Sequence, residues 1–124
     1  MQTMFLIALF GALGCLARYV LSGWVYKTIG GVFPSGTLAV NIVGAFCIGL
    51  IMEFSMRSVL VSPSLRIGLT IGFLGGLTTF STFSYETFRL LEEGELLIAV
   101  GNVLVSVLAC LVFTWLGILT AKAL

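Results

Sequence analysis

The sequence predicts an all-α membrane protein with four transmembrane helices, of which the third is broken in mid-membrane. Three observations predict this fold class. The chain of 124 residues is 60% hydrophobic and only 9% charged, whereas a soluble domain carries about 25% charged residues. The few charged residues divide the chain into four apolar runs. The third run contains a polar segment with two glycines, GGLTTFSTFSYE, at residues 75–86.

Each of the four apolar runs is long enough to cross a bilayer, which takes about 20 residues in a helix. The first run ends in Trp24 and Tyr26, aromatic residues typical of a membrane interface. Because it has no basic n-region and three further runs follow it, we interpret it as a span and not as a cleaved signal peptide. We therefore expect a single transmembrane domain over residues 1–124. Its spans cover about residues 4–26, 36–54, 67–88 and 96–121.

The basic residues do not favour one orientation in the membrane. An even number of spans puts both termini on one side, which holds Arg57, Arg66 and Lys122. The other side holds Lys27 and Arg89. Cytoplasmic loops normally carry a clear excess of Lys and Arg, so the near balance leaves open both noisy counts and insertion in both orientations. Four helices leave little room for a pore, so transport would require an oligomer.

Composition and motifs exclude several functional classes. A net charge of +1 offers no strong field for a nucleic acid, so no such partner is expected. The chain has no histidine, no aspartate and no GxxxxGK[ST] phosphate loop, which argues against an enzyme. Cys15, Cys47 and Cys110 lie far apart without metal-ligand spacing, and we expect them to be small buried apolar residues.

The segment at residues 75–86 predicts the break in the third span. Gly75 and Gly76 are poor helix formers, and the hydroxyls of Thr78 and Thr79 can bond to the backbone instead. A break at membrane depth is tolerated only where it is buried in protein or lines a cavity. It frees backbone carbonyls, which can bind a cation, and leaves a half-helix N-terminus, which favours an anion.

A ladder of small residues precedes the break. Gly68, Gly72 and Gly76 are spaced four apart, a pattern that lets two helix backbones approach closely. Packing within one subunit would need the same glycines, and we favour a contact between subunits.

The residues after the break can interact with a small anion. Phe80 and Phe83 are three apart and share a helix face, and the edge of an aromatic ring is its positive part. Ser81, Thr82 and Ser84 supply hydroxyl donors beside them. Plain core packing of the two rings is the alternative.

Polar residues also occur inside the other spans. Asn41 lies in the middle of the second span and forms either an interhelical hydrogen bond or part of a pathway. Arg18 lies inside the first span, where it either reaches the headgroups or serves a function. In the fourth span, polar packing or a polar track explains a stripe of residues four apart. This stripe consists of Asn102, Ser106, Cys110 and Thr114. No carboxylate occurs in the interior of the first, second or fourth span, since Glu53 only closes the second apolar run; this favours an anion over a cation.

Three motifs resemble the Fluc/CrcB family of small fluoride channels. They are GALGCLARY (11–19), GTLAVNIVGAFCIG (36–49) and GGLTTFSTFSYE (75–86). The third motif is the most specific, and the fourth span is less distinctive. The resemblance implies an antiparallel, dual-topology homodimer with two fluoride pathways. It also implies a fluoride-selective channel that exports fluoride passively from the bacterial cytoplasm across the inner (plasma) membrane.

The resemblance also implies roles for individual residues. Phe80 and Phe83 are expected to line the pathways beside Asn41, and Arg18 to lie near an aqueous vestibule. Glu86 is expected to have a supportive or gating role. Asn102 and Ser106 are expected to continue a polar track, and Cys110 follows them with a thiol where a hydroxyl would continue that track. A structural Na⁺ at the dimer interface would be bound by backbone carbonyls around Gly75 and Thr78 of both subunits.

Two alternatives from other classes stay open on the residues alone. A small multidrug exporter also has four helices and dual topology, but such proteins resemble proton-coupled carriers with a glutamate in the first helix. The first span here has Arg18 and no carboxylate. A structural subunit or assembly factor without transport is the second alternative, and a flux assay on pure protein would separate it from a channel.

Overall fold

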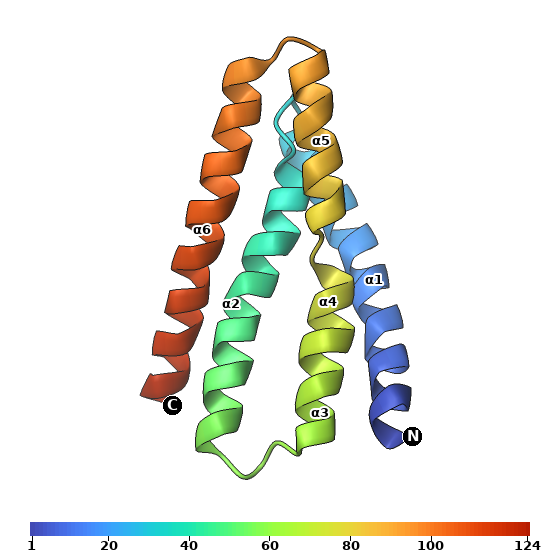
Figure 1. The fold of residues 1–124 in the computed structure, drawn as a ribbon, viewed down its shortest axis with the longest axis vertical. Helices are drawn as coiled ribbons and strands as arrows, with labels where there is room; N and C mark the ends of the chain where they lie inside the picture. The colour runs from blue at the N-terminus through green and yellow to red at the C-terminus, as the bar shows by residue number, and fades with distance from the viewer.

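The computed structural model describes residues 1–124, and nearly all of them are helical (Figure 1). The elements are α1 (Gln2–Ile29), α2 (Ser35–Arg57), α3 (Pro63–Ile67), the π-helix η1 (Gly68–Leu74), α4 (Gly75–Leu77), α5 (Phe80–Glu92) and α6 (Leu96–Ala123). Both termini lie at the same end of the molecule. The all-helical fold class with a broken third span is confirmed.

Four helical stretches are long and apolar enough to cross a membrane. They are Gln2–Ile29, Ser35–Arg57, Pro63–Glu92 and Leu96–Ala123. At most ends the helices continue a few residues past the predicted spans, because polar residues at a bilayer surface can stay helical. The chain is therefore a multi-pass membrane protein.

Local sequence explains where the helices start and stop. Ser62 caps α3 by accepting a hydrogen bond from Leu65 N at 3.2 Å, and Pro63 occupies the first helical position, where its missing N–H costs nothing. Gly94 between α5 and α6 has φ +80°, a left-handed conformation that glycine adopts readily. These signals keep the connections short.

The helices pack as two pairs, with the third span running from one pair to the other and α1 also in contact with α2. α2 packs along α6, while α1 packs along η1 and α4. Beyond the break, α5 packs against α6 and not against α1. The two halves of the third span therefore have different neighbours, and the break lies where the span passes from one helix pair to the other (Figure 1).

The glycine ladder of the third span packs against α1 of the same chain, which corrects the interpretation as a contact between subunits. A Cβ at Gly72 would lie 2.9 Å from Ile7 O, and one at Gly76 would lie 2.6 Å from Gly11 O. Only a residue without a side chain permits this approach of two backbones. Gly49 of α2 and Gly117 of α6 likewise allow the backbones of α2 and α6 to approach closely.

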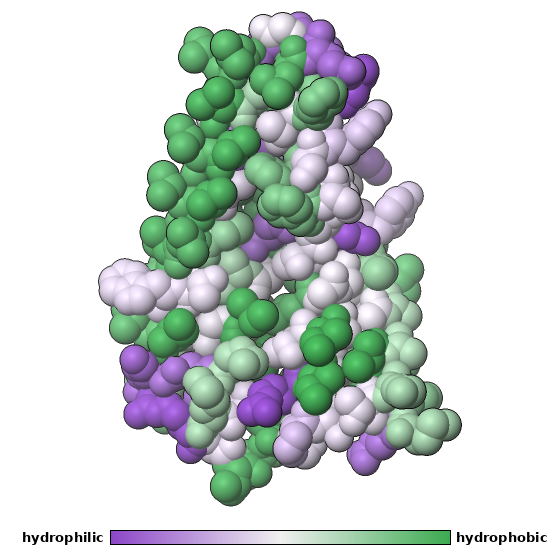
Figure 2. Space-filling model, viewed as in Figure 1, coloured by the Kyte–Doolittle hydropathy of each residue, from purple (hydrophilic) through white to green (hydrophobic).

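The core is small and most of the apolar surface faces outward. Only 20 of the 124 residues are buried, and Val40, Leu74 and Leu77 form the central cluster. Hydrophobic side chains cover much of one face along α6, with hydrophilic ones concentrated at the two ends (Figure 2). Such an outer surface suits hydrocarbon or a second copy of the chain, and not water.

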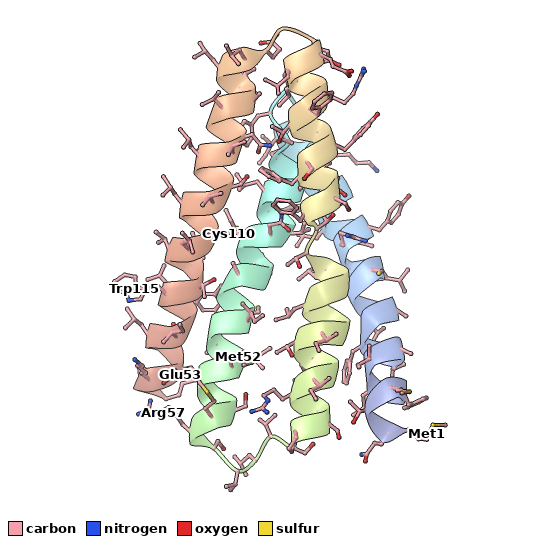
Figure 3. All side chains as sticks on the ribbon, in the orientation of Figure 1. Met1, Met52, Glu53, Arg57, Cys110 and Trp115 are labelled. Carbon is pink, nitrogen blue, oxygen red and sulfur yellow. The ribbon has the colours of Figure 1, made fainter.

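The labelled side chains of Figure 3 illustrate this division. Trp115 points away from the bundle, and Glu53 and Arg57 lie at the end of the molecule that also holds Met1. The cysteines are less buried than the sequence suggested: Cys15 is exposed, and Cys47 and Cys110 are half-buried. Their exposure follows from the small core of the single chain.

Candidate functional site

The third span is interrupted at Thr78 and Thr79. Both residues are extended, with ψ 159° at Thr78 and φ −152° at Thr79. Thr79 then caps α5, because its Oγ1 accepts a hydrogen bond from Thr82 N at 3.1 Å. The predicted break is confirmed here, although Gly75 and Gly76 stay helical. Gly76 packs closely against α1, whereas Gly75 is exposed and has no close neighbour on α1.

A π-helical stretch precedes the break and was not predicted. The N–H of Gly75 donates to Thr70 O, five residues earlier, which is the hydrogen-bond spacing of a π-helix. Such stretches are frequent at functional sites. The local sequence GLTIGFL contains no signal that distinguishes this conformation from an α-helix.

Asn41 of α2 holds the interrupted backbone with both ends of its amide. Its Nδ2 donates to Thr79 O at 3.0 Å, and its Oδ1 accepts from Thr79 N at 2.8 Å. In an unbroken helix Thr79 N would instead donate to Gly75 O. The carbonyl of Gly75 is therefore released from its usual helical partner. Of the two predicted roles of Asn41, the interhelical hydrogen bond is therefore confirmed.

Arg18 of α1 reaches the same break. Its Nη1 donates to Thr78 O at 3.3 Å, and the side chain is half-buried. The guanidinium therefore turns toward the interior of the bundle and not along α1 to the headgroups. Donors from two different helices thus contact the two backbone carbonyls of the interruption.

The first of two hollows beside the break is here called the phenylalanine groove. It has a volume of about 470 Å³, and its walls come from α2, the third span and α6. The rings of Phe80 and Phe83 lie 5.4 Å apart at 45°. The groove contains no charged residue. Asn41 and Ser106 line it together with the rings, as do Gly75, Thr78, Cys110 and Thr114.

The second hollow, here called the arginine pocket, lies between α1, α2 and α5 and has a volume of about 510 Å³. It is lined by Cys15, Arg18, Tyr19, Ser22, Tyr26, Thr37, Val40, Thr79, Thr82 and Glu86. Glu86 Oε2 accepts a hydrogen bond from the Tyr26 hydroxyl at 2.5 Å, and its Oε1 accepts one from the Thr37 hydroxyl. Thr79 lines both hollows, so the interruption forms a wall between them.

The remaining predicted site residues lie around the two hollows. Asn102 is 1% exposed and lines neither hollow. It donates to Thr87 Oγ1 at 2.8 Å and accepts from Ser106 at 3.2 Å, so it ties α6 to α5 directly behind Ser106. Ser81 bonds to Thr79 Oγ1 at 3.3 Å, and Ser84 bonds back to Phe80 O at 2.9 Å. Both serines are exposed outside the two hollows.

Sequence reasoning missed Tyr26 and Thr37 as members of this site. The sequence indicates only that Tyr26 is an aromatic residue at the membrane interface. Its contact with Glu86 joins residues 60 positions apart. Such pairing is not visible without the arrangement of the helices. The available signal was Glu86 itself, because a carboxylate within a span requires hydroxyl or cationic partners.

The fold and the two hollows define a class: a small multi-pass membrane protein with an uncharged polar and aromatic groove at a broken helix. The chain belongs to the CrcB family. The family model described as CrcB-like protein, Camphor Resistance (CrcB), matches residues 5–118. Members of this family are membrane channels and not enzymes.

Curated relatives match the chain over its whole length. A protein of Geotalea uraniireducens (strain Rf4) is 80% identical over 124 residues, which is 100% of both chains. A protein of Geobacter metallireducens (strain ATCC 53774 / DSM 7210 / GS-15) is 72% identical with the same full coverage. A protein of Geobacter sulfurreducens (strain ATCC 51573 / DSM 12127 / PCA) is 64% identical, again with full coverage. Each is named "Fluoride-specific ion channel FluC".

Proposed function

We propose that this protein is a fluoride-selective channel through which fluoride leaves the cytoplasm passively. The observation that carries the proposal is the phenylalanine groove. Two aromatic rings, an amide and hydroxyls surround it, and no carboxylate opposes an anion there. The names of the full-length relatives support the choice of fluoride.

The chemistry of the groove suits an anion that holds its water tightly. Ring edges of Phe80 and Phe83 carry partial positive charge, and the Asn41 amide, which gives one N–H to Thr79 O, has a second N–H to donate. Together they replace hydration along the path, which is how channel linings compensate a dehydrated ion. The larger chloride ion makes poorer contacts with these closely spaced groups.

The proposed assembly is an antiparallel homodimer with two pathways. Phe80 is 78% exposed in the single chain, so one side of the groove lacks a cover that a second copy would supply. The near balance of basic residues between the two sides of the membrane supports insertion in both orientations. Inverted symmetry between two identical chains then produces two equivalent pathways.

A structural Na⁺ between the two copies is part of this proposal. The carbonyls of Gly75 and Thr78 would hold it. Gly75 is exposed and its carbonyl lacks its usual helical partner. Thr78 O accepts one hydrogen bond from Arg18, which leaves a second lone pair for a cation. The ion would supply positive charge that links the two subunits.

The direction of transport follows from acid–base chemistry and the membrane potential. Hydrogen fluoride crosses membranes as a neutral weak acid and ionises in a neutral cytoplasm. A negative interior then drives the anion outward with about 2.3 kcal/mol per charge per 100 mV. The proposed location is the inner membrane of a bacterium, where the channel would lower cytoplasmic fluoride without coupling to another substrate.

Reconstitution tests the function directly. Liposomes containing the purified protein are loaded with potassium fluoride or potassium chloride, valinomycin is added, and selective electrodes follow anion efflux. We expect rapid fluoride efflux with little chloride efflux. Absence of fluoride efflux from folded dimers would contradict the proposal and favour a structural subunit. Proton-dependent uptake of a cationic dye would instead favour a multidrug exporter.

Substitution of the groove rings tests its role in the same assay. Phe80→Ile and Phe83→Ile remove the ring edges, and we expect fluoride efflux to fall at least about fivefold, the rate equivalent of about 1 kcal/mol. Phe88→Ile is the matched control, since Phe88 lies on the same helix, is exposed and lines neither hollow. Unchanged efflux in both groove variants would exclude the ring-edge interaction.

A further inference from the structure

Arg18 and Glu86 line the same pocket without forming an ion pair. The ion pairs in the chain join Glu53 with Arg57, and Arg89 with Glu92 and Glu93, all near helix ends. Opposite charges inside a membrane protein attract each other strongly because the surroundings screen them poorly. The separation of Arg18 from Glu86 therefore requires a cause.

The cause is a pair of hydroxyl groups that donate hydrogen bonds to the two oxygens of the Glu86 carboxylate. Tyr26 donates to Glu86 Oε2 at 2.5 Å, and Thr37 donates to Glu86 Oε1. Hydrogen bonds to an ionised carboxylate are short and about twice as strong as neutral ones. With both oxygens held by hydroxyl donors, Glu86 gains less from turning toward Arg18.

The position of the Tyr26 ring is fixed by its surroundings. The ring lies directly against Gly36, where any Cβ would collide with the ring carbons. The Tyr26 hydroxyl also lies 3.1 Å from Thr37 Oγ1 and accepts from Thr37 N at 3.4 Å. The hydroxyl is therefore directed at Glu86 by contacts from a second helix. The Tyr26–Glu86 contact is the one side-chain hydrogen bond between α1 and α5, and these two helices do not otherwise pack against each other.

We propose that Tyr26 is a positioning residue that keeps Glu86 away from Arg18 and so keeps Arg18 available to an entering anion. The inference rests on the proposed fluoride channel. Without the tyrosine hydroxyl, the carboxylate turns toward Arg18 within the arginine pocket, pairs with it and neutralises the cation there. The pair would also release the guanidinium from Thr78 O and fill the pocket.

A double-mutant cycle separates this role from simple structural support. Tyr26→Phe is expected to lower fluoride efflux at least about fivefold. In the Glu86→Gln background the same substitution is expected to change efflux less than about twofold, because a neutral amide forms no ion pair with Arg18. An equal loss in both backgrounds, or no loss in either, would overturn the proposal. Tyr85→Phe is the matched control, since Tyr85 precedes Glu86 on α5 and is exposed.

A second measurement does not depend on flux. Solid-state NMR on reconstituted protein with ¹⁵N-labelled arginine and ¹³C-labelled glutamate detects guanidinium–carboxylate contacts. We expect a new contact in Tyr26→Phe that is absent from the parent, while the pairs at the helix ends appear in both. Identical spectra would contradict the proposal, whatever the flux. If the parent chain moves no fluoride, the proposed function fails, and the NMR comparison still decides the role of Tyr26.

Discussion

At the scale of single residues, Asn41 shows how a broken helix is maintained inside a membrane. One side chain supplies both a donor and an acceptor to the same backbone residue, Thr79. Backbone groups in hydrocarbon cost several kcal/mol each when they have no partner. An amide carries its donor and its acceptor on two separate atoms, so it can pair with the N–H and the C=O of one residue at once. An ionised aspartate has no donor, and a threonine hydroxyl offers donor and acceptor from a single atom.

Replacement of Asn41 by leucine is therefore expected to destabilise the fold. Asn41→Leu keeps the size of the side chain but leaves Thr79 N–H and C=O without partners. We expect a loss of about 2–4 kcal/mol in the free energy of unfolding, since each unpaired group costs about 1–3 kcal/mol. Unfolding in mixed micelles, followed by circular dichroism, measures the change. Ser84→Ala, which removes only a bond within its own helix, should cost less than about 0.5 kcal/mol.

The residue scale also marks a limit of sequence reasoning. The pairing of Phe80 with Phe83 follows from their spacing, because residues three apart share a helix face. The contacts of Asn41 with Thr79 and of Tyr26 with Glu86 span 38 and 60 positions. They depend on which helices are neighbours. Composition and local pattern contain no information on that point.

At the scale of elements, the third span packs against both helix pairs, which also touch each other where α1 contacts α2. Its first half follows α1 and its second half follows α6. The sequence predicted the break correctly, because Thr78 and Thr79 combine extended preference with hydroxyls that cap a helix. It attributed the neighbouring glycines to the wrong interface, because a small-residue ladder fits a neighbour within the chain and a neighbour from another chain equally well.

Alanine at two glycines provides a matched test of this packing. Gly76→Ala places a Cβ 2.6 Å from Gly11 O, so α1 and the third span must separate. We expect the free energy of unfolding to fall by about 1–3 kcal/mol, the usual cost of overpacking. Gly23→Ala lies on α1 with nothing within 4 Å and gains helix propensity, so it should be neutral or stabilising. Equal thermal stability of the two variants would contradict the close approach.

At the scale of the whole molecule, the fold follows from composition while the assembly does not. Four apolar spans are predictable because a bilayer permits only helices or closed barrels. The outer surface of the single chain stays largely apolar, and lipid and a second copy are equally apolar covers for it. The distribution of charges is therefore the only sequence feature that addresses orientation.

Added lysines test whether both orientations are needed. Val59→Lys/Leu60→Lys adds two lysines on the side of the termini, and Val32→Lys/Glu95→Lys adds two lysines and removes one carboxylate on the other. All four positions are exposed. Each variant alone is expected to insert in one orientation and to lose most fluoride efflux, and co-expression of both should restore it. The same positions changed to glutamine are the control. Full efflux from either biased variant alone would exclude the antiparallel dimer.

The π-helical stretch at Gly68–Leu74 has a consequence for how this chain tolerates changes in length. Each residue of an α-helix turns the following chain by about 100°. Removing or adding one residue upstream of the break would therefore rotate Thr78 and everything up to the cap of α5. Asn41 and Arg18, which are fixed on other helices, would then face different backbone atoms. In this segment the spacing of residues is constrained more strictly than their identity, so point substitutions should be found among relatives there and insertions or deletions should not.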